Sequence, residues 1–145
     1  MAKMKEQITA VSKGMNTTGE AQGHKVVIDE PAKAGGTDEG ANPLATLLVS
    51  LAGCENAIAN FVAKEMDFDL RGIEFEINGE LDPRGMMGNK EVRPYFQTIN
   101  VNATVTTSET EERLKELQEK VDQRCPVYQT LIAADVEMNP EWVKA

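Results

Sequence analysis

The sequence predicts a single α+β domain over residues 1–145, with largely antiparallel sheets packed around one long central helix. Three observations lead to this fold class. Apolar residues recur at helical spacing from Asn42 to Lys64. Two segments, 72–80 and 95–107, alternate apolar and polar residues as half-buried strands do. Predicted strands also follow one another directly along the chain, which favours antiparallel pairing.

The helix from Asn42 to Lys64 has a well-defined start. Asn42 is a good N-cap residue, and Pro43 fits the first helical position, where its missing N–H would have no partner anyway. We expect one buried stripe that carries a thiol into the apolar interior. Its members are Leu44, Leu47, Leu48, Leu51, Cys54, Ile58, Phe61 and Val62.

The segment before this helix predicts a hairpin within residues 5–30. Gly19 to Gly23 forms the expected break between its strands, and the run His24–Ile28 is rich in β-branched residues. Asp29-Glu30-Pro31 ends that strand. Residues 31–41 are small, polar and glycine-rich without a phosphate-binding pattern, so they predict a connecting loop.

After the strand at 95–107, Ser108 and Glu111 form a capping-box pattern that predicts a second helix. Pro126 ends this helix and starts a third, with Cys125 as its N-cap. Residues 135–138 predict a last short strand before Pro140. The buried stripe expected on the second helix consists of Leu114, Leu117, Val121 and Cys125.

Composition narrows the classes of function. The formal charge of −9 argues against nucleic acid or an anionic membrane as a partner, since both require a cationic surface. The N-terminus is too polar for a secretory signal, and no apolar run approaches the roughly 20 residues of a membrane span. We therefore expect a cytoplasmic protein. Two cysteines and His24 do not make a usual zinc set, so neither a metal nor another cofactor is expected.

The two cysteines, Cys54 and Cys125, carry the most specific chemistry. Both fall on inward stripes, and packing of those stripes would bring the thiols together. Close thiols permit oxidation of one to a sulfenic acid and condensation with the other to a disulfide. Two unreactive core cysteines are the alternative. Local electrostatics favours Cys125 as the thiolate, because it starts a helix beside Arg124, whereas Glu55 opposes ionisation of Cys54.

The run G-x-N-P-L-x-x-L-L-x-S-L-A-G-C from Gly40 to Cys54, with Arg124-Cys125-Pro126-Val127 downstream, resembles the OsmC/Ohr superfamily. The resemblance covers the chain from about His24 to its end. It implies an intertwined homodimer with active sites at the subunit interface, and a thiol peroxidase that reduces organic hydroperoxides. By the same resemblance Cys54 is the peroxidatic cysteine, Cys125 is the resolving cysteine, and a dithiol, such as a lipoylated protein, is the reductant.

The chain departs from this family at the groups that activate the thiolate. Well-known members have an arginine in the N-terminal strands and a glutamate just after the helix-opening proline. Here the first arginine is Arg71, and Leu44 and Ala45 follow Pro43. The resemblance is therefore to a divergent OsmC-like branch, and a non-catalytic dimer that binds a small apolar ligand is the rival function. The candidate substitutes are Glu39, Glu55, Lys25, Arg84, Arg93 and Arg124.

Overall fold

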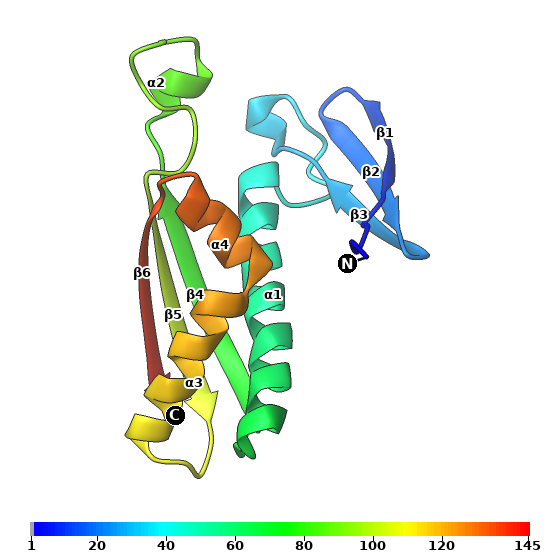
Figure 1. The fold of residues 1–145 in the computed structure, drawn as a ribbon. Coiled ribbons are helices and arrows are strands. Elements are labelled where there is room, and N and C mark those ends of the chain that lie inside the picture. Colours follow the sequence, from blue (N-terminus) through cyan, green and yellow to red (C-terminus); the bar gives the residue numbers. More distant parts are fainter. Residues whose placement is uncertain (1) are drawn as a thin grey trace. The chain divides into compact units, whose positions relative to one another are not determined.

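The computed structural model describes residues 2–145, which form two compact units, one ending at Leu47 and the other running from Leu48 to Ala145. The element order is β1–β2–β3, then α1, β4, α2, β5, α3, α4 and β6 (Figure 1). Strands and helices are both abundant, and three of the four strand pairings are antiparallel. The α+β class predicted from the sequence is confirmed.

The first unit contains a three-stranded antiparallel meander. Its strands are β1 (Thr9–Lys13), β2 (Asn16–Ala21) and β3 (His24–Ile28), in the spatial order β1-β2-β3. The predicted break at Gly19–Gly23 is wrong in part, because Gly19 lies inside β2 and pairs with Ala10 and Val26. The segment that was predicted to form a hairpin therefore forms a three-stranded meander.

Asp29 organises the loop that follows β3, and it is the one buried residue among those described up to Leu47. Its carboxylate accepts hydrogen bonds from the Thr37 hydroxyl at 2.7 Å and the Glu30 N–H at 2.8 Å. These donors, with further ones from Asn16 and Glu39, hold the pKa of Asp29 well below its usual range. The loop also includes the short 3₁₀ turn Ala32–Ala34. Because these hydrogen bonds converge on Asp29, the loop is arranged around the buried carboxylate of that residue.

Helix α1 (Pro43–Met66) begins as predicted, with the Asn42 side chain accepting a hydrogen bond from the Ala45 N–H at 2.8 Å. The predicted buried stripe is partly wrong. Leu51 and Val62 are buried, but Phe61 is 61% exposed, and Leu44 and Leu47 are also exposed. The buried face is shifted round the helix, and its members are Leu51, Glu55, Ala59, Val62 and Ala63.

The second unit contains the sheet β4 (Gly72–Glu80), β5 (Thr98–Thr106) and β6 (Glu137–Lys144), in the spatial order β4-β5-β6. Strands β4 and β5 pair antiparallel, whereas β5 and β6 pair parallel. A parallel neighbour needs a crossover, and the two helices between β5 and β6 supply it. The predicted stop before Pro140 is wrong, because β6 lies at an edge, where a strand tolerates a proline.

The crossover helices are α3 (Glu111–Arg124) and α4 (Pro126–Ala133), while the loop at 82–93 contains the single turn α2 (Pro83–Met86). The predicted capping box is wrong. Thr110 caps α3 by accepting from the Arg113 N–H, and the Ser108 hydroxyl instead donates to Asp69. Cys125 caps α4 as predicted, since its sulfur accepts a hydrogen bond from the Tyr128 N–H at 3.4 Å.

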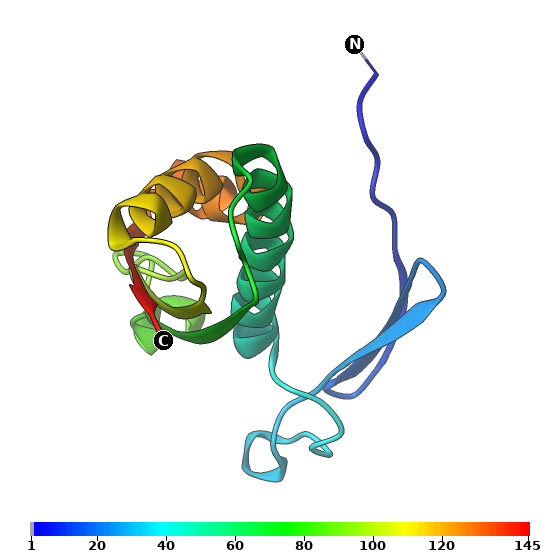
Figure 2. The ribbon, with the colours of Figure 1, turned by 90° about the horizontal axis from the view of Figure 1, so that it is seen from below.

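The core of the second unit lies between its sheet and its helices (Figures 1 and 2). The alternating side chains of β5 supply its strand side, and the predicted stripe of α3 supplies much of its helix side. One cluster gathers around Leu117 and Trp142, and the other around Leu51 and Cys125. The second cluster contains Cys125, and Cys54 packs against it.

By length and composition alone, α1 is apolar enough to cross a membrane, so the expectation that no such run exists is wrong. This is weak evidence for a span, because the core helices of soluble proteins pass the same test. Leu51, Ala59 and Val62 on its buried face pack in the two core clusters, and the same face holds the carboxyl group of Glu55. These contacts are those of a core helix.

Candidate active site

The structure brings Cys54 and Cys125 together. Cys125, at the junction of α3 and α4, is completely buried, and Cys54, in the middle of α1, is half-buried. Both belong to the apolar cluster that includes Leu51 and Ile99. Cys54 packs against the cluster that contains Cys125, its thiol interacts with that of Cys125, and neither cysteine is in a disulfide. Two sulfurs far apart in the sequence thus share one site.

Burial raises the pKa of the Cys125 thiol far above its usual range, and the interaction with the Cys54 thiol raises it further. The Tyr128 N–H lowers this pKa, but its effect is smaller than that of burial. The local argument that favoured Cys125 as the thiolate is therefore wrong. The amide dipoles at the start of α4 do not offset the loss of water around the sulfur.

Two buried carboxyl groups adjoin these thiols. Glu55 on α1 is completely buried, and it faces Asp122 on α3 and the thiol of Cys125. Burial, followed by the hydrogen bond and charge of Asp122, raises the pKa of Glu55 to about 9. Burial also raises the pKa of Asp122. Two carboxylates this close cannot both be ionised without a large cost, so the pair retains a proton at neutral pH.

Tyr128 on α4 belongs to the same acidic group. Burial raises the pKa of its hydroxyl, and the charges of Asp122, Glu55 and Cys125 raise it further. No lysine, arginine or histidine contributes to the pKa shifts of these four groups in the part of the chain described. The site is therefore a buried apolar cluster in which two thiols adjoin acidic groups.

The cationic candidates of the second unit are engaged elsewhere. Arg124 forms two hydrogen bonds with Glu65, at 2.7 and 3.0 Å, although it neighbours Cys125 in the sequence. Arg84 pairs with Asp82, and Arg93 pairs with Asp135 and stacks on Tyr95. Lys25 lies on exposed β3, while Glu39 accepts from Asn16. Among the candidate activating residues of the second unit, Glu55 is therefore the one that lies beside Cys125.

Sequence reasoning placed Glu55 as an obstacle to ionisation of Cys54 and did not consider Asp122. The sequence does indicate that Glu55 is buried, because this residue lies four positions after Leu51 and four before Ala59, on the buried face of α1. Asp122 precedes Cys125 by one helical turn, but α3 carries many acidic residues on its exposed side. The burial of Asp122 depends on how α3 packs within the second unit, which no local sequence pattern indicates.

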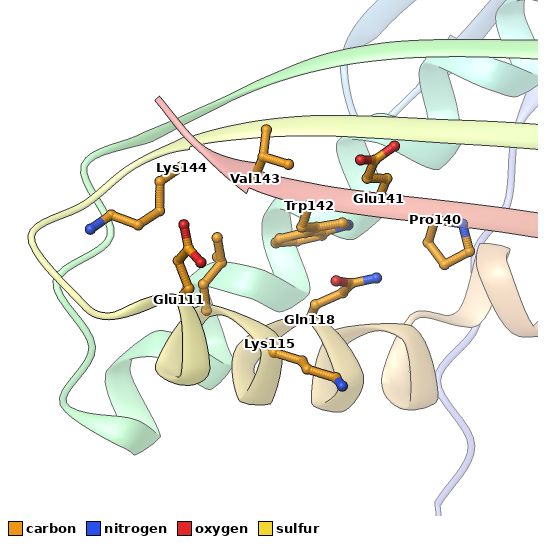
Figure 3. A pocket seen from close by; sticks show the side chains of 9 residues that line it. Glu111, Lys115, Gln118, Pro140, Glu141, Trp142, Val143 and Lys144 are labelled. Atoms are coloured by element: carbon orange, nitrogen blue, oxygen red, sulfur yellow. The ribbon is translucent and has the colours of Figure 1, made fainter.

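An open pocket of about 520 Å³ lies between α3 and β6 (Figure 3). Trp142 points from β6 toward Gln118 of α3, and the indole N–H is buried without a partner among the described residues. Neither cysteine lines this pocket. Across residues 2–145 no group of three histidine, cysteine or acidic side chains is placed to hold a metal ion.

Comparison with known proteins identifies the family to which this chain belongs. The family described as OsmC-like protein matches residues 36–141, and the chain belongs to that family. A hydroperoxide reductase of Mycoplasma pneumoniae is 30% identical over 131 residues, which cover 88% of this chain and 86% of that protein. A hydroperoxide reductase of Mycoplasma genitalium is 32% identical over 96 residues, covering 64% of this chain and 63% of the relative.

Solved structures support the same fold. The crystal structure of an OsmC-like protein from Mycoplasma pneumoniae matches with a TM-score of 0.84 at 23% identity and covers 99% of both chains. An organic hydroperoxide resistance protein from Legionella pneumophila matches with a TM-score of 0.73 at 18% identity and covers both chains completely. At these identities the structures establish the fold alone.

Proposed function

We propose that this protein is a thiol peroxidase that reduces organic hydroperoxides, with Cys54 as the peroxidatic and Cys125 as the resolving cysteine. The observation that carries the proposal is the contact between the two thiols at the centre of the second unit. Membership of the OsmC-like family and relatives named hydroperoxide reductase support the choice of substrate class. The assignment to oxidative-stress defence is part of the same proposal.

In the first step the Cys54 thiolate attacks the distal oxygen of the peroxide. The O–O bond breaks, the alcohol leaves after it takes up a proton, and Cys54 becomes a sulfenic acid. In the second step Cys125 forms a disulfide with Cys54, and water is released. A dithiol, of which a lipoylated protein is the proposed example, then reduces the disulfide. None of these steps requires a metal or an organic cofactor.

The order of the two cysteines is supported by their environments. Cys125 is completely buried with a raised pKa, whereas Cys54 is half-buried and more accessible to a peroxide. A buried thiol that stays protonated suits a resolving role, because it is protected until its neighbour has been oxidised.

The proposal includes a cytoplasmic homodimer in which residues 1–145 act as one OsmC-like domain. The family match over residues 36–141 includes the end of the first unit and nearly all of the second. The N-terminal meander is too poorly buried to be stable by itself, since three strands need an apolar face covered. Its exposed apolar side chains, with those at the start of α1, offer a surface for a second copy; they are Ile8, Val11, Val26, Val27, Leu44 and Leu47.

The test is intact-protein mass spectrometry after addition of cumene hydroperoxide to the reduced protein. We expect loss of the mass of two hydrogen atoms from the wild-type chain, and no such loss from Cys54→Ser. If both thiols stay free in excess peroxide, the peroxidase proposal is wrong. A stable complex with an apolar ligand, of equal affinity in Cys54→Ala, would then favour the binding protein.

A further inference from the structure

The pocket between α3 and β6 has no role in the reaction outlined above, yet it has the size and lining of a ligand site. Its volume of about 520 Å³ lies within the range of roughly 300–1,000 Å³ that is usual for small-molecule sites. Leu114 and Trp142 supply apolar surface, while Lys115 and Gln118 supply polar groups. Neither cysteine lines the pocket, so a ligand here would occupy a site separate from the thiols.

Trp142 places an unused hydrogen-bond donor at this pocket. Its side chain packs edge-on against Phe75, with 6.1 Å between the ring centroids, and the residue is only 7% exposed. The buried indole N–H has no partner within residues 2–145, although leaving such a donor unsatisfied destabilises the folded chain. The ring extends from β6 toward Gln118 of α3 (Figure 3). Because Gln118 is only half-buried, rotation of its side chain would give a ligand in the pocket access to the indole N–H.

Lys115 adds a positive charge to the same pocket. The other basic residues of α3 are paired, Arg113 with Glu109, Lys120 with Glu116 and Arg124 with Glu65. Lys115 forms no ion pair among the described residues, although Glu111 and Glu119 each lie four positions from it on the helix. Lys115 also lies three residues before Gln118, so these two side chains project from the same face of α3. The unpaired cation of this helix therefore lies on the side from which a ligand would reach the indole.

The carboxylates that line the pocket do not cancel this charge. Glu141 precedes Trp142 in β6, so its side chain points to the opposite face of the strand, away from α3 (Figure 3). Glu111 lies seven residues before Gln118, which is about two helical turns. The end of the pocket at Gln118 thus combines a cation with an unsatisfied donor, which is an environment for an anion.

We propose that the pocket between α3 and β6 binds a small organic carboxylate with an apolar body. One carboxylate oxygen accepts a hydrogen bond from the indole N–H of Trp142, and the ammonium group of Lys115 pairs with the carboxylate. The apolar body of the ligand lies against Leu114 and the indole ring. An alcohol of the same length lacks the ion pair, and an amine is repelled by Lys115. Binding here involves neither thiol, so the proposal is independent of the peroxidase function.

The test uses Trp142 as its own reporter. The chain contains one tryptophan, so the indole N–H gives a single resonance in the NMR spectrum of isotope-labelled protein. The reduced protein is titrated with sodium hexanoate and, in parallel, with hexan-1-ol and hexylamine. We expect hexanoate to shift the indole proton downfield to saturation, with a dissociation constant in the millimolar range because the probe has few atoms. Hexan-1-ol and hexylamine should bind more weakly by a factor of about five or more.

Two variants examine the two contacts separately. Lys115→Gln removes the cation at an exposed position, and it should weaken hexanoate binding by a factor of about five or more without affecting folding. Lys120→Gln makes the same change elsewhere on α3 and should bind hexanoate like the wild type. Trp142→Phe keeps an aromatic ring and removes the donor, so calorimetry should show a similar loss of affinity. If Trp142→Phe fails to fold, Lys115→Gln still provides the test.

Three results would overturn the proposal. An indole proton that does not move up to about 20 mM hexanoate shows that no carboxylate reaches Trp142, as when the Gln118 carbonyl already accepts from it. Equal binding of hexan-1-ol and hexanoate shows that apolar contact alone is responsible. Equal affinity of Lys115→Gln and the wild type shows that Lys115 does not hold the carboxylate. None of these results bears on the reaction of Cys54 with peroxide.

Discussion

Replacement of Glu55 by glutamine should change how the stability of the protein depends on pH. Burial and Asp122 raise the pKa of this carboxyl group from 4.5 to about 9 in the folded protein. Between these values the folded chain holds a proton that the unfolded chain has lost, so the free energy of unfolding falls as the pH rises. The slope is about 1.4 kcal/mol per pH unit, or roughly 2.7 kcal/mol from pH 6 to pH 8.

That loss is a large fraction of the roughly 5–15 kcal/mol that stabilises a typical domain. At about 4 °C per kcal/mol it corresponds to a fall of about 10 °C in Tm. The carboxyl groups with lowered pKa, such as Asp29 and Asp82, titrate below this window and do not contribute. Glutamine has nearly the same shape and no proton to lose, so the Glu55→Gln protein should lack this part of the slope.

The assay is thermal unfolding, followed by circular dichroism or calorimetry, at pH 6, 7 and 8 and constant ionic strength. The difference in Tm between the wild type and Glu55→Gln should change by about 10 °C across this range. Glu119→Gln makes the same chemical change at an exposed position of α3, so its difference from the wild type should stay constant. If the Glu55→Gln difference is also constant, Glu55 is ionised in the folded protein at neutral pH and the reasoning is refuted.

Three further predictions concern the scaffold and its charges. Leu117→Ala removes a completely buried side chain of α3 and should lower the free energy of unfolding in urea by about 2–5 kcal/mol; a loss below about 1 kcal/mol would mean that α3 does not pack as described. Asp29→Asn removes a carboxylate with a lowered pKa, whose stabilisation is present above pH 4 and lost on acidification. Proteolysis of the loop at 30–41 should therefore be faster in the variant at pH 7, and the difference should shrink toward pH 3; equal rates at pH 7 would contradict the structure. Arg124→Met breaks an exposed pair with Glu65 and should leave the rate of Cys54 oxidation within twofold of the wild type; a tenfold loss would show that Arg124 acts on the thiols.

Sequence patterns predicted the elements whose side chains divide cleanly between core and water. In β5, Ile99, Val101, Ala103 and Val105 alternate with polar residues, and all four are buried. The start of α1 and the junction at Cys125 were also predictable, because Asn42, Pro43 and Pro126 have direct consequences for the backbone. These features depend on local chemistry.

The features that were missed depend on neighbours distant in the sequence. Phe61 was predicted to be buried because it is apolar, whereas the buried face of α1 is centred on Glu55 and Ala59. Strand β6 continues through Pro140 because it forms a sheet edge, which no local pattern indicates. The same reasoning applies to the site. The two cysteines could be nominated from their motifs, but the acidic partners of Cys125 became visible only once α3 was packed against α1.

The sulfur of Cys125 also holds the first turn of α4, since it accepts the amide hydrogen of Tyr128. A disulfide with Cys54 would redirect this sulfur and weaken its hold on that amide. The opening turn of α4 would then loosen whenever the thiols are oxidised and tighten again on reduction. Hydrogen–deuterium exchange at the Tyr128 amide would therefore report whether the two cysteines are oxidised or reduced, without any added label.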